Sequence, residues 1–277
     1  MDTRRIARVV TGGIVGGAAV MVLASCGDMI TDSASDDATI RESITAVRFA
    51  TDAGNVTIRT GETTAVHRTV HYNGERPGTT HKVDGDTLVL ESCPERNCWI
   101  DYEVVVPDGT AVSGSVGSGD VAVTGLASAN ISSGSGDAAV RGVAGAVNVE
   151  AGSGEVTLDD IGDDVAVRTG SGDVTVTNTR AAVTMVVGSG DVLASGLGGA
   201  ATVESGSGGV TLTLASPQDV QVTAQSGDVK VVVPDDTYRV ELDSSSGDIE
   251  SAVENDPSGT HTIDVTTASG EIDVERA

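Results

Sequence analysis

The sequence predicts an all-β protein in which units of about 18 residues stack into a β-solenoid. A Ser-Gly-acidic-Val/Ile turn recurs between residues 120 and 271, with 17 to 23 residues from one turn to the next when the turn at Gly209 is counted. Between turns, apolar and polar residues alternate, as at Val174 and Val176 and again at Val183 and Met185, which is typical of strands with one buried face. Only 2% of the residues are aromatic, so we expect a narrow interior filled by Val and Ala.

The recurring turn defines one edge of the predicted stack. Glycine before the acidic residue permits a positive φ, and a short carboxylate can accept hydrogen bonds from turn amides. Gly209 occupies the single vacant position in the series. The acidic residues of the turns are Asp120, Asp137, Glu155, Asp173, Asp191, Asp228, Asp248 and Glu271.

A strand pair of this size cannot bury its own apolar face, so the units must pack on one another. Nine rungs at about 4.8 Å each predict a rod roughly 40 Å long. An antiparallel meander or sandwich is the alternative architecture, since Gly-Asp turns also join hairpins. The regular spacing favours the solenoid.

The first 25 residues resemble the signal peptide of a bacterial lipoprotein. Arg4, Arg5 and Arg8 form a basic start, and an uncharged run rich in Val, Ala and Gly follows. The run leads to Leu-Ala-Ser-Cys at residues 23–26, which resembles the lipobox in which the cysteine thiol receives diacylglycerol. A transmembrane anchor is the alternative, although the glycines would make a weak spanning helix. The paired arginines also suggest twin-arginine export, but Sec export is the preferred interpretation.

We therefore expect Cys26 to be lipidated and to hold the chain on the extracytoplasmic face of the cell membrane. Residues 26–42 carry Asp28, Asp32, Asp36 and Asp37 among Ser, Thr and Ala, with no apolar period. This composition predicts an acidic flexible tether. The net charge of −25 argues against nucleic acid as a partner.

Residues 43–109 are expected to form a less regular N-terminal β section that caps the β-repeat domain of residues 110–277. Residues 52–58, Asp-Ala-Gly-Asn-Val-Thr-Ile, look like a worn copy of the repeated turn and strand. Once Cys26 is acylated, Cys93 and Cys98 remain as a matched pair in an oxidising compartment, which predicts a disulfide that closes a hairpin loop. A zinc site is the alternative, but the sequence has no second pair of thiols.

The acidic edge is a candidate cation or interaction edge. In a stack built in chain order, neighbouring carboxylates would lie about 5 Å apart and repel by about 0.9 kcal/mol per pair in water. Either each carboxylate folds back onto turn amides, or Ca²⁺ lies between the rungs. One acidic residue per rung supplies few ligands, so no cofactor is firmly expected. His67 and His71 would lie about 13 Å apart on one strand face, too far for a shared metal.

These residues resemble the bacterial DUF4097 family of β-strand-repeat proteins, whose members are described as adhesins. In that family Tyr-x-Val-x-Val-Pro-x-Gly precedes a run of Gly-Ser-Gly-Asp-Val turns. Here residues 102–109 read Tyr-Glu-Val-Val-Val-Pro-Asp-Gly, and residues 117–121 read Gly-Ser-Gly-Asp-Val. The resemblance covers residues 44–277 and implies a β-solenoid-like fold at the cell envelope. It brings no catalytic motif.

The sequence thus predicts a cell-envelope lipoprotein with a non-catalytic β-repeat domain that binds or adheres to an envelope polymer or protein, or serves as a scaffold. An envelope-stress or regulatory accessory that contacts membrane proteins is the alternative. A glycan-acting β-helix enzyme is a more distant one, because the glycine-rich turns lead into strands rather than helices and no catalytic triad spacing occurs.

Overall fold

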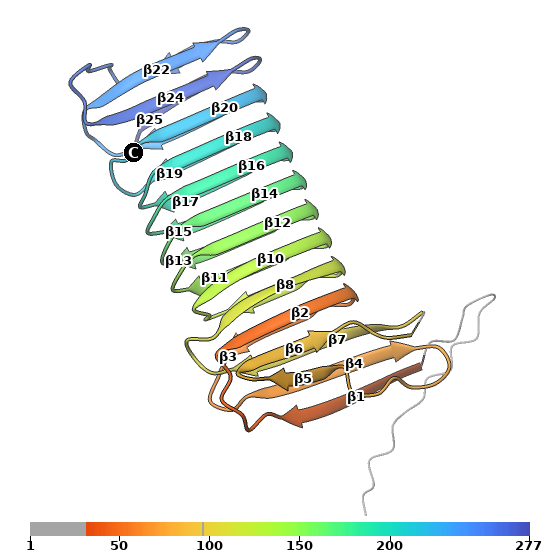
Figure 1. Cartoon of the computed structure of the whole chain (residues 1–277). Coiled ribbons are helices and arrows are strands. Elements are labelled where there is room, and N and C mark those ends of the chain that lie inside the picture. The colour runs from red at the N-terminus through yellow and green to blue at the C-terminus, as the bar shows by residue number, and fades with distance from the viewer. Residues whose placement is uncertain (1–31, 96) are drawn as a thin grey trace, which may run out of the picture. The chain divides into compact units, whose positions relative to one another are not determined.

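A computed structural model describes residues 32–95 and 97–277, and every regular element in them is a β-strand (Figure 1). The strands form two long sheets, a 13-stranded sheet A and a 12-stranded sheet B. The predicted all-β solenoid is therefore confirmed. The candidate signal peptide and Cys26 lie outside the described residues. Within the described ranges, no helix is long and apolar enough to span a membrane.

Each rung of the stack consists of a strand in sheet B, a Ser-Gly-acidic turn and a strand in sheet A. The repeat strands of sheet B are β8 (Ala111–Ser118), β10 (Ser128–Ser135), β12 (Val147–Ser153), β14 (Val165–Ser171), β16 (Val183–Ser189), β18 (Ala201–Ser207), β20 (Val220–Ser226), β22 (Tyr238–Ser244) and β24 (His261–Thr267). Those of sheet A are β9 (Val121–Thr124), β11 (Ala138–Val143), β13 (Val156–Ile161), β15 (Val174–Thr179), β17 (Val192–Leu197), β19 (Val210–Leu214), β21 (Val229–Val233), β23 (Ile249–Ser251) and β25 (Ile272–Arg276).

Neighbouring rungs pair in parallel and in register, which excludes the antiparallel sandwich for the repeats. Val165 of β14 lies beside Val183 of β16, and Val167 lies beside Met185. Equivalent side chains therefore lie over one another, and the inward-facing ones form a single buried core between the two sheets. Because the two sheets face each other closely, the small and medium aliphatic residues of the repeats fill this space.

The order of the rungs departs from chain order at both ends. The rung of β2 (Ala46–Ala53) and β3 (Val56–Thr60) lies between the β8–β9 rung and that of β6 (Thr87–Glu91) and β7 (Trp99–Val106). Likewise, the β24–β25 rung lies between β20–β21 and β22–β23. Excluding the antiparallel strands, each sheet contributes eleven strands to the stack. Residues 43–109 thus share both sheets and the core with the repeats.

Three antiparallel strands complete the N-terminal end, and one of them corrects the predicted tether. Strand β1 (Asp32–Thr39) pairs with β4 (Ala65–Tyr72), which pairs with β7, while β5 (His81–Asp84) pairs with β6. The prediction of a flexible tether is therefore wrong for Asp32–Thr39. Polar residues without an apolar period can still form an edge strand, because the backbone supplies the hydrogen bonds and only one neighbour is needed.

The C-terminal end of sheet B is closed by a loop rather than a strand. The Asn255 side-chain oxygen accepts a hydrogen bond from the Val240 amide at 3.0 Å. The Asp256 amide donates to the Tyr238 carbonyl at 2.9 Å. These bonds cover part of the outer edge of β22, which would otherwise present unpaired backbone groups to another chain.

Candidate functional site

The acidic residues of the Ser-Gly turns form a ladder of hydrogen bonds between rungs. The Asp120 carboxylate accepts from the Asp137 amide at 2.9 Å, and the Asp137 carboxylate accepts from the Glu155 amide at 2.8 Å. The same bond joins Asp173 to the Asp191 amide at 2.9 Å and Asp228 to the Glu271 amide at 2.9 Å. Each aspartate therefore binds the backbone of the neighbouring turn rather than its own.

The ladder stops wherever the side chain has the wrong length. The Asp191 carboxylate accepts from the Gly209 amide at 2.8 Å, but Gly209 has no side chain to offer the Asp228 amide. Glu155, which is one methylene longer than aspartate, instead accepts from the Thr157 hydroxyl at 3.1 Å. The length of the turn side chain thus decides whether a rung continues the row of hydrogen bonds.

The row of acidic turn residues differs from the sequence-based expectation in the order of its members, and it extends further toward the N-terminal end. Asp248 and Glu271 are reversed, because the β24–β25 rung is inserted before β22–β23, so Glu271 follows Asp228. At the other end, Asn55 accepts from the Asp120 amide at 2.9 Å, and Asp101 accepts from the Asn55 amide at 2.8 Å. The place of Asn55 could have been predicted, because residues 52–58 resemble the repeated turn and strand. The place of Asp101 could not, because a cysteine loop replaces the Ser-Gly turn before it.

The geometry gives the acidic edge a structural role. Every hydrogen bond in the ladder satisfies a turn amide, and a hydrogen bond to a charged acceptor contributes about 1.5–3 kcal/mol, more than the roughly 0.9 kcal/mol of repulsion between unscreened neighbours. Within residues 32–95 and 97–277, no group of three or more His, Cys, Asp or Glu side chains is arranged to hold a metal ion. To bind a cation, the acidic edge would need ligands in addition to those that the described residues bring together there.

Cys93 and Cys98 form a disulfide, with their Cα atoms 5.9 Å apart. Because β6 belongs to sheet B and β7 to sheet A, the loop between them is the corner of a rung and not the hairpin that the sequence suggested. The disulfide closes the corner that replaces a Ser-Gly turn. Both cysteines are partly buried and pack against the core, so the bridge fixes the point at which Trp99 begins β7.

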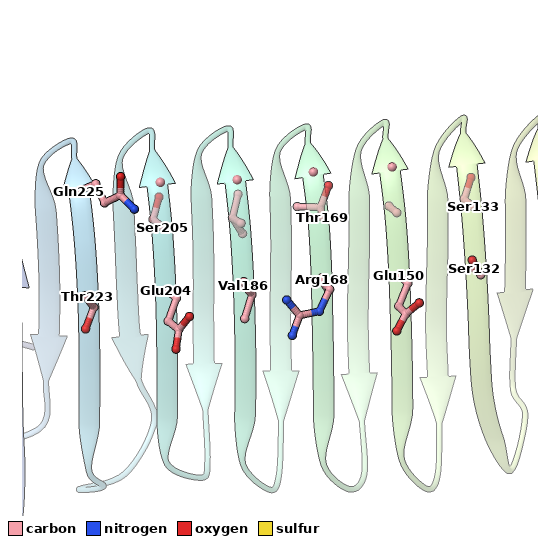
Figure 2. A pocket seen from close by; sticks show the side chains of 16 residues that line it. Ser132, Ser133, Glu150, Arg168, Thr169, Val186, Glu204, Ser205, Thr223 and Gln225 are labelled. Carbon is pink, nitrogen blue, oxygen red and sulfur yellow. The ribbon is translucent and has the colours of Figure 1, made fainter.

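A groove crosses the outer face of sheet B, and sequence reasoning did not identify it. It has a volume of about 700 Å³ and spans strands β10 to β20. In Figure 2 the side chains of Glu150, Arg168, Val186 and Glu204 lie in one row across successive strands. Strand register places these four residues directly beside one another.

The floor of the groove is glycine backbone. Gly152, Gly170, Gly188 and Gly206 occupy one outward position on successive strands. A Cβ atom at Gly170 would lie 2.7 Å from the Gly152 carbonyl oxygen, and one at Gly188 would lie 2.5 Å from that of Gly170. Close stacking of the rungs therefore requires these glycines, and the groove is the consequence. In the sequence, the first glycine of each Gly-Ser-Gly turn could have indicated this groove.

The charged groups of the groove are free to bind a ligand. Among the described residues, no salt bridge or hydrogen bond engages the side chains of Glu150, Arg168 or Glu204, and all three are exposed. Ser132 and Thr223 add hydroxyl groups at the two ends. At about 4.8 Å per strand, the row from Ser132 to Thr223 covers about 24 Å, which suits an extended polar chain rather than a small molecule.

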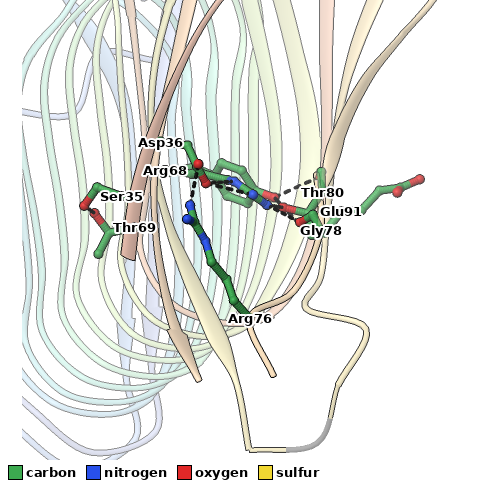
Figure 3. A network of polar contacts seen from close by, with 9 residues as sticks. Ser35, Asp36, Arg68, Thr69, Arg76, Gly78, Thr80 and Glu91 are labelled. Atoms are coloured by element: carbon green, nitrogen blue, oxygen red, sulfur yellow. Dashed lines mark hydrogen bonds and ion pairs between the residues drawn. The ribbon is translucent and has the colours of Figure 1, made fainter. Parts of the chain in front are cut away.

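A network of polar contacts around the buried Arg68 fixes strand β1 at the N-terminal end (Figure 3). Arg68 of β4 is only 4% exposed and pairs with Asp36 at 2.8 Å, and it donates to the Gly78 carbonyl at 2.7 Å and the Thr80 hydroxyl at 2.8 Å. Arg76 also pairs with Asp36. Burial opposes ionisation of Asp36, but the hydrogen bonds from Arg76 and Arg68 outweigh it, so the pKa of Asp36 is lowered.

The two histidines of β4 have separate partners. His67 Nδ1 lies 2.7 Å from Asp37, whose hydrogen bond raises the pKa of His67. His71 lies 3.0 Å from Asp101 and stacks on Trp99, with ring centroids 4.8 Å apart. Neither histidine belongs to a group of three or more His, Cys, Asp or Glu side chains that could hold a metal ion within the described part of the chain.

Comparison with known proteins assigns the family. No curated protein matches the chain. Two of the solved structures that match it are a putative adhesin from Bacteroides fragilis, with 16% identity and a TM-score of 0.45 over 89% of this chain and 97% of that one, and a putative cell adhesion protein from Clostridium sporogenes, with 10% identity and a TM-score of 0.23 over 89% of this chain and 100% of that one. The profile of one family covers nearly all of the stack, residues 44–275. The chain therefore belongs to the Toastrack DUF4097 family.

Proposed function

We propose that this chain is an exported lipoprotein, anchored to the extracytoplasmic face of the cell membrane through Cys26. Its non-catalytic β-repeat rod binds an extended polymer of the envelope in the groove of sheet B. The observation that carries the binding role is the row of unpaired Glu150, Arg168 and Glu204 along a glycine floor. The lipobox at residues 23–26 supports the anchor.

The chemistry of the groove favours a hydroxyl-rich, polar polymer such as a polysaccharide. The row carries two carboxylates and one guanidinium, so the groove can accept from hydroxyl or amide donors and donate to acceptors in the same ligand. The overall charge of −25 repels strongly anionic polymers. Glu150 and Glu204, the two carboxylates of the groove, lie three strands and about 14 Å apart, farther than the paired carboxylates of glycoside hydrolases, which supports binding rather than hydrolysis.

Co-sedimentation of the purified protein with isolated cell-wall polysaccharide tests the groove. Val186→Tyr fills it and Arg168→Ala removes its only cation, so both variants are expected to bind at least about tenfold more weakly. Thr175→Tyr places the same bulk on the outer face of sheet A and serves as the matched control. Unchanged binding by Val186→Tyr, or equal loss in the control, would contradict the proposal.

Mass spectrometry of the membrane-extracted protein tests the anchor. We expect an N-terminal cysteine bearing diacylglycerol, and we expect a Cys26→Ser chain to be released from membranes. A full-length chain that stays in the membrane with an unmodified Cys26 would contradict it.

A further inference from the structure

Trp99 is held rigidly at the surface of the N-terminal cap. It is the only tryptophan of the chain and is 37% exposed. Its indole stacks on His71 with an interplanar angle of 10°, and the Asp101 carboxylate lies 3.0 Å from Nε2 of that histidine. The Cys93–Cys98 disulfide immediately precedes it. These contacts give an aromatic side chain a fixed outward orientation that packing of the core does not require.

Trp99 lies at the end of the cap where the chain enters the structure. Asp32, the first described residue, pairs with Tyr72, and the neighbouring His71 pairs with Trp99. Strands are about 4.8 Å apart, so the backbones of Asp32 and Trp99 are separated by about 10 Å.

The short distance in sequence between Cys26 and Asp32 limits how far this end can lie from a lipid on Cys26. Because β1 is fixed in sheet A, only six peptide units separate the two residues, and they span at most about 20 Å. The 17-residue tether predicted from residues 26–42 would have allowed a much greater reach. An acyl chain on Cys26 therefore keeps the backbone of Trp99 within about 30 Å of the bilayer surface, a distance at which Trp99 can reach the headgroups.

We propose that Trp99 inserts into the headgroup region of the membrane that holds the lipid anchor, so that the rod stands on its N-terminal cap. This inference rests on the lipidation of Cys26 proposed above. Tryptophan prefers the membrane interface because its ring is apolar while its N–H remains hydrated. The lipid anchor keeps Trp99 at a high local concentration near the membrane. One aromatic residue therefore suffices to set the orientation of the rod on the membrane, even though the chain is acidic.

Fluorescence quenching in vesicles tests the contact. The lipidated protein is reconstituted in phosphatidylcholine vesicles with and without brominated acyl chains, and the emission of Trp99 is measured. We expect bromination to reduce the emission by about half, with a blue shift relative to the detergent-free Cys26→Ser chain. A Trp99→Phe, Leu193→Trp chain is the control, because Leu193 is 50% exposed on β17, far along the rod.

Quenching of Trp99 but not of the tryptophan at position 193 supports the inference. Equal quenching of both would show that the rod lies flat, and absence of quenching in a chain whose diacylglyceryl group is verified by mass spectrometry would show that Trp99 stays in water. Either result overturns the inference and leaves the lipid anchor intact. A chain without the lipid would overturn both proposals. A spectral shift with soluble polysaccharide, and none with vesicles, would assign Trp99 to sugar binding instead.

Discussion

The Asp120 carboxylate accepts a hydrogen bond from the backbone amide of Asp137, 2.9 Å away on the next rung. This bond explains how a row of like charges can line one edge of the stack. The carboxylate supplies the reach and the acceptor oxygen, and its charge has two opposing effects: it strengthens the hydrogen bond and it repels the neighbouring carboxylates.

Two substitutions at Asp137 separate these effects. Asp137→Ala removes the acceptor for the Glu155 amide and should lower the free energy of unfolding by about 1 kcal/mol. Asp137→Asn keeps an oxygen at the same reach and removes one charge, so it should match or exceed the parent stability, most clearly at low salt. Urea unfolding at two salt concentrations measures both. Greater stability in both variants would mean that repulsion dominates and that the bond contributes nothing.

Glu155→Asp should extend the ladder without changing the charge. The shorter side chain can reach the Asp173 amide as Asp137 reaches that of Glu155, so we expect a gain of about 0.5–1 kcal/mol. A thermal unfolding scan of the variant beside the parent detects it. A loss of stability would show that the Thr157 hydrogen bond matters more than the ladder.

The adjacent glycines at 208 and 209 should respond oppositely to alanine. Gly208 has a φ of +118°, and a Cβ there would lie 2.1 Å from the Gly190 carbonyl oxygen, so Gly208→Ala should destabilise by more than about 2 kcal/mol. At Gly209 the nearest atoms would be 3.6 Å and 3.8 Å away, and Gly209→Ala should be neutral or slightly stabilising. Similar midpoints for the two variants in denaturant would refute the observed turn geometry.

Acid should release strand β1 before the stack unfolds. The pKa of Asp36 is lowered, so its pairing with Arg68 and Arg76 stabilises β1 above the unfolded pKa of about 4 and is lost as the pH falls through the lower folded value. The pKa of His67 is raised, so its smaller, exposed contribution acts below about pH 6.5 and is lost as the pH rises through the folded value. Hydrogen exchange of residues 32–39, corrected for intrinsic rates, should show weakest protection below pH 4.

Asp36→Asn provides the control for that experiment. Without the ionisable group, protection of β1 should be low at neutral pH and should change little on acidification. Protection that still collapses below pH 4 in this variant would assign the acid response to other carboxylates.

The sequence predicts the repeats well because their determinants are local. Val174 and Val176 alternate with polar residues, and the positive φ of glycines such as Gly172 and Gly190 is required within a few residues of each acidic position. The parallel stack then follows from the need to bury one face. The spacing of 17 to 23 residues predicts where each rung lies in the sequence, but it does not predict the order in which the rungs stack.

The features that the sequence did not predict depend on distant partners. Glu271 receives its hydrogen-bond acceptor from Asp228, 43 residues away, because a later rung is inserted before an earlier one. Strand β1 has no apolar period, and its place is set by Arg68 from another strand. The groove exists only when glycines of successive rungs are aligned, so no single repeat reveals it.

Distances between spin labels test the parallel stack most directly. Ser118 and Ser226 occupy the same turn position six rungs apart, and Ser118 and Ser189 occupy it four rungs apart. With nitroxide labels at these pairs, pulsed electron paramagnetic resonance should give separations of about 29 Å and 19 Å, growing linearly with rung number. Separations that do not increase from the four-rung pair to the six-rung pair would contradict a single stack with its turns aligned along one edge.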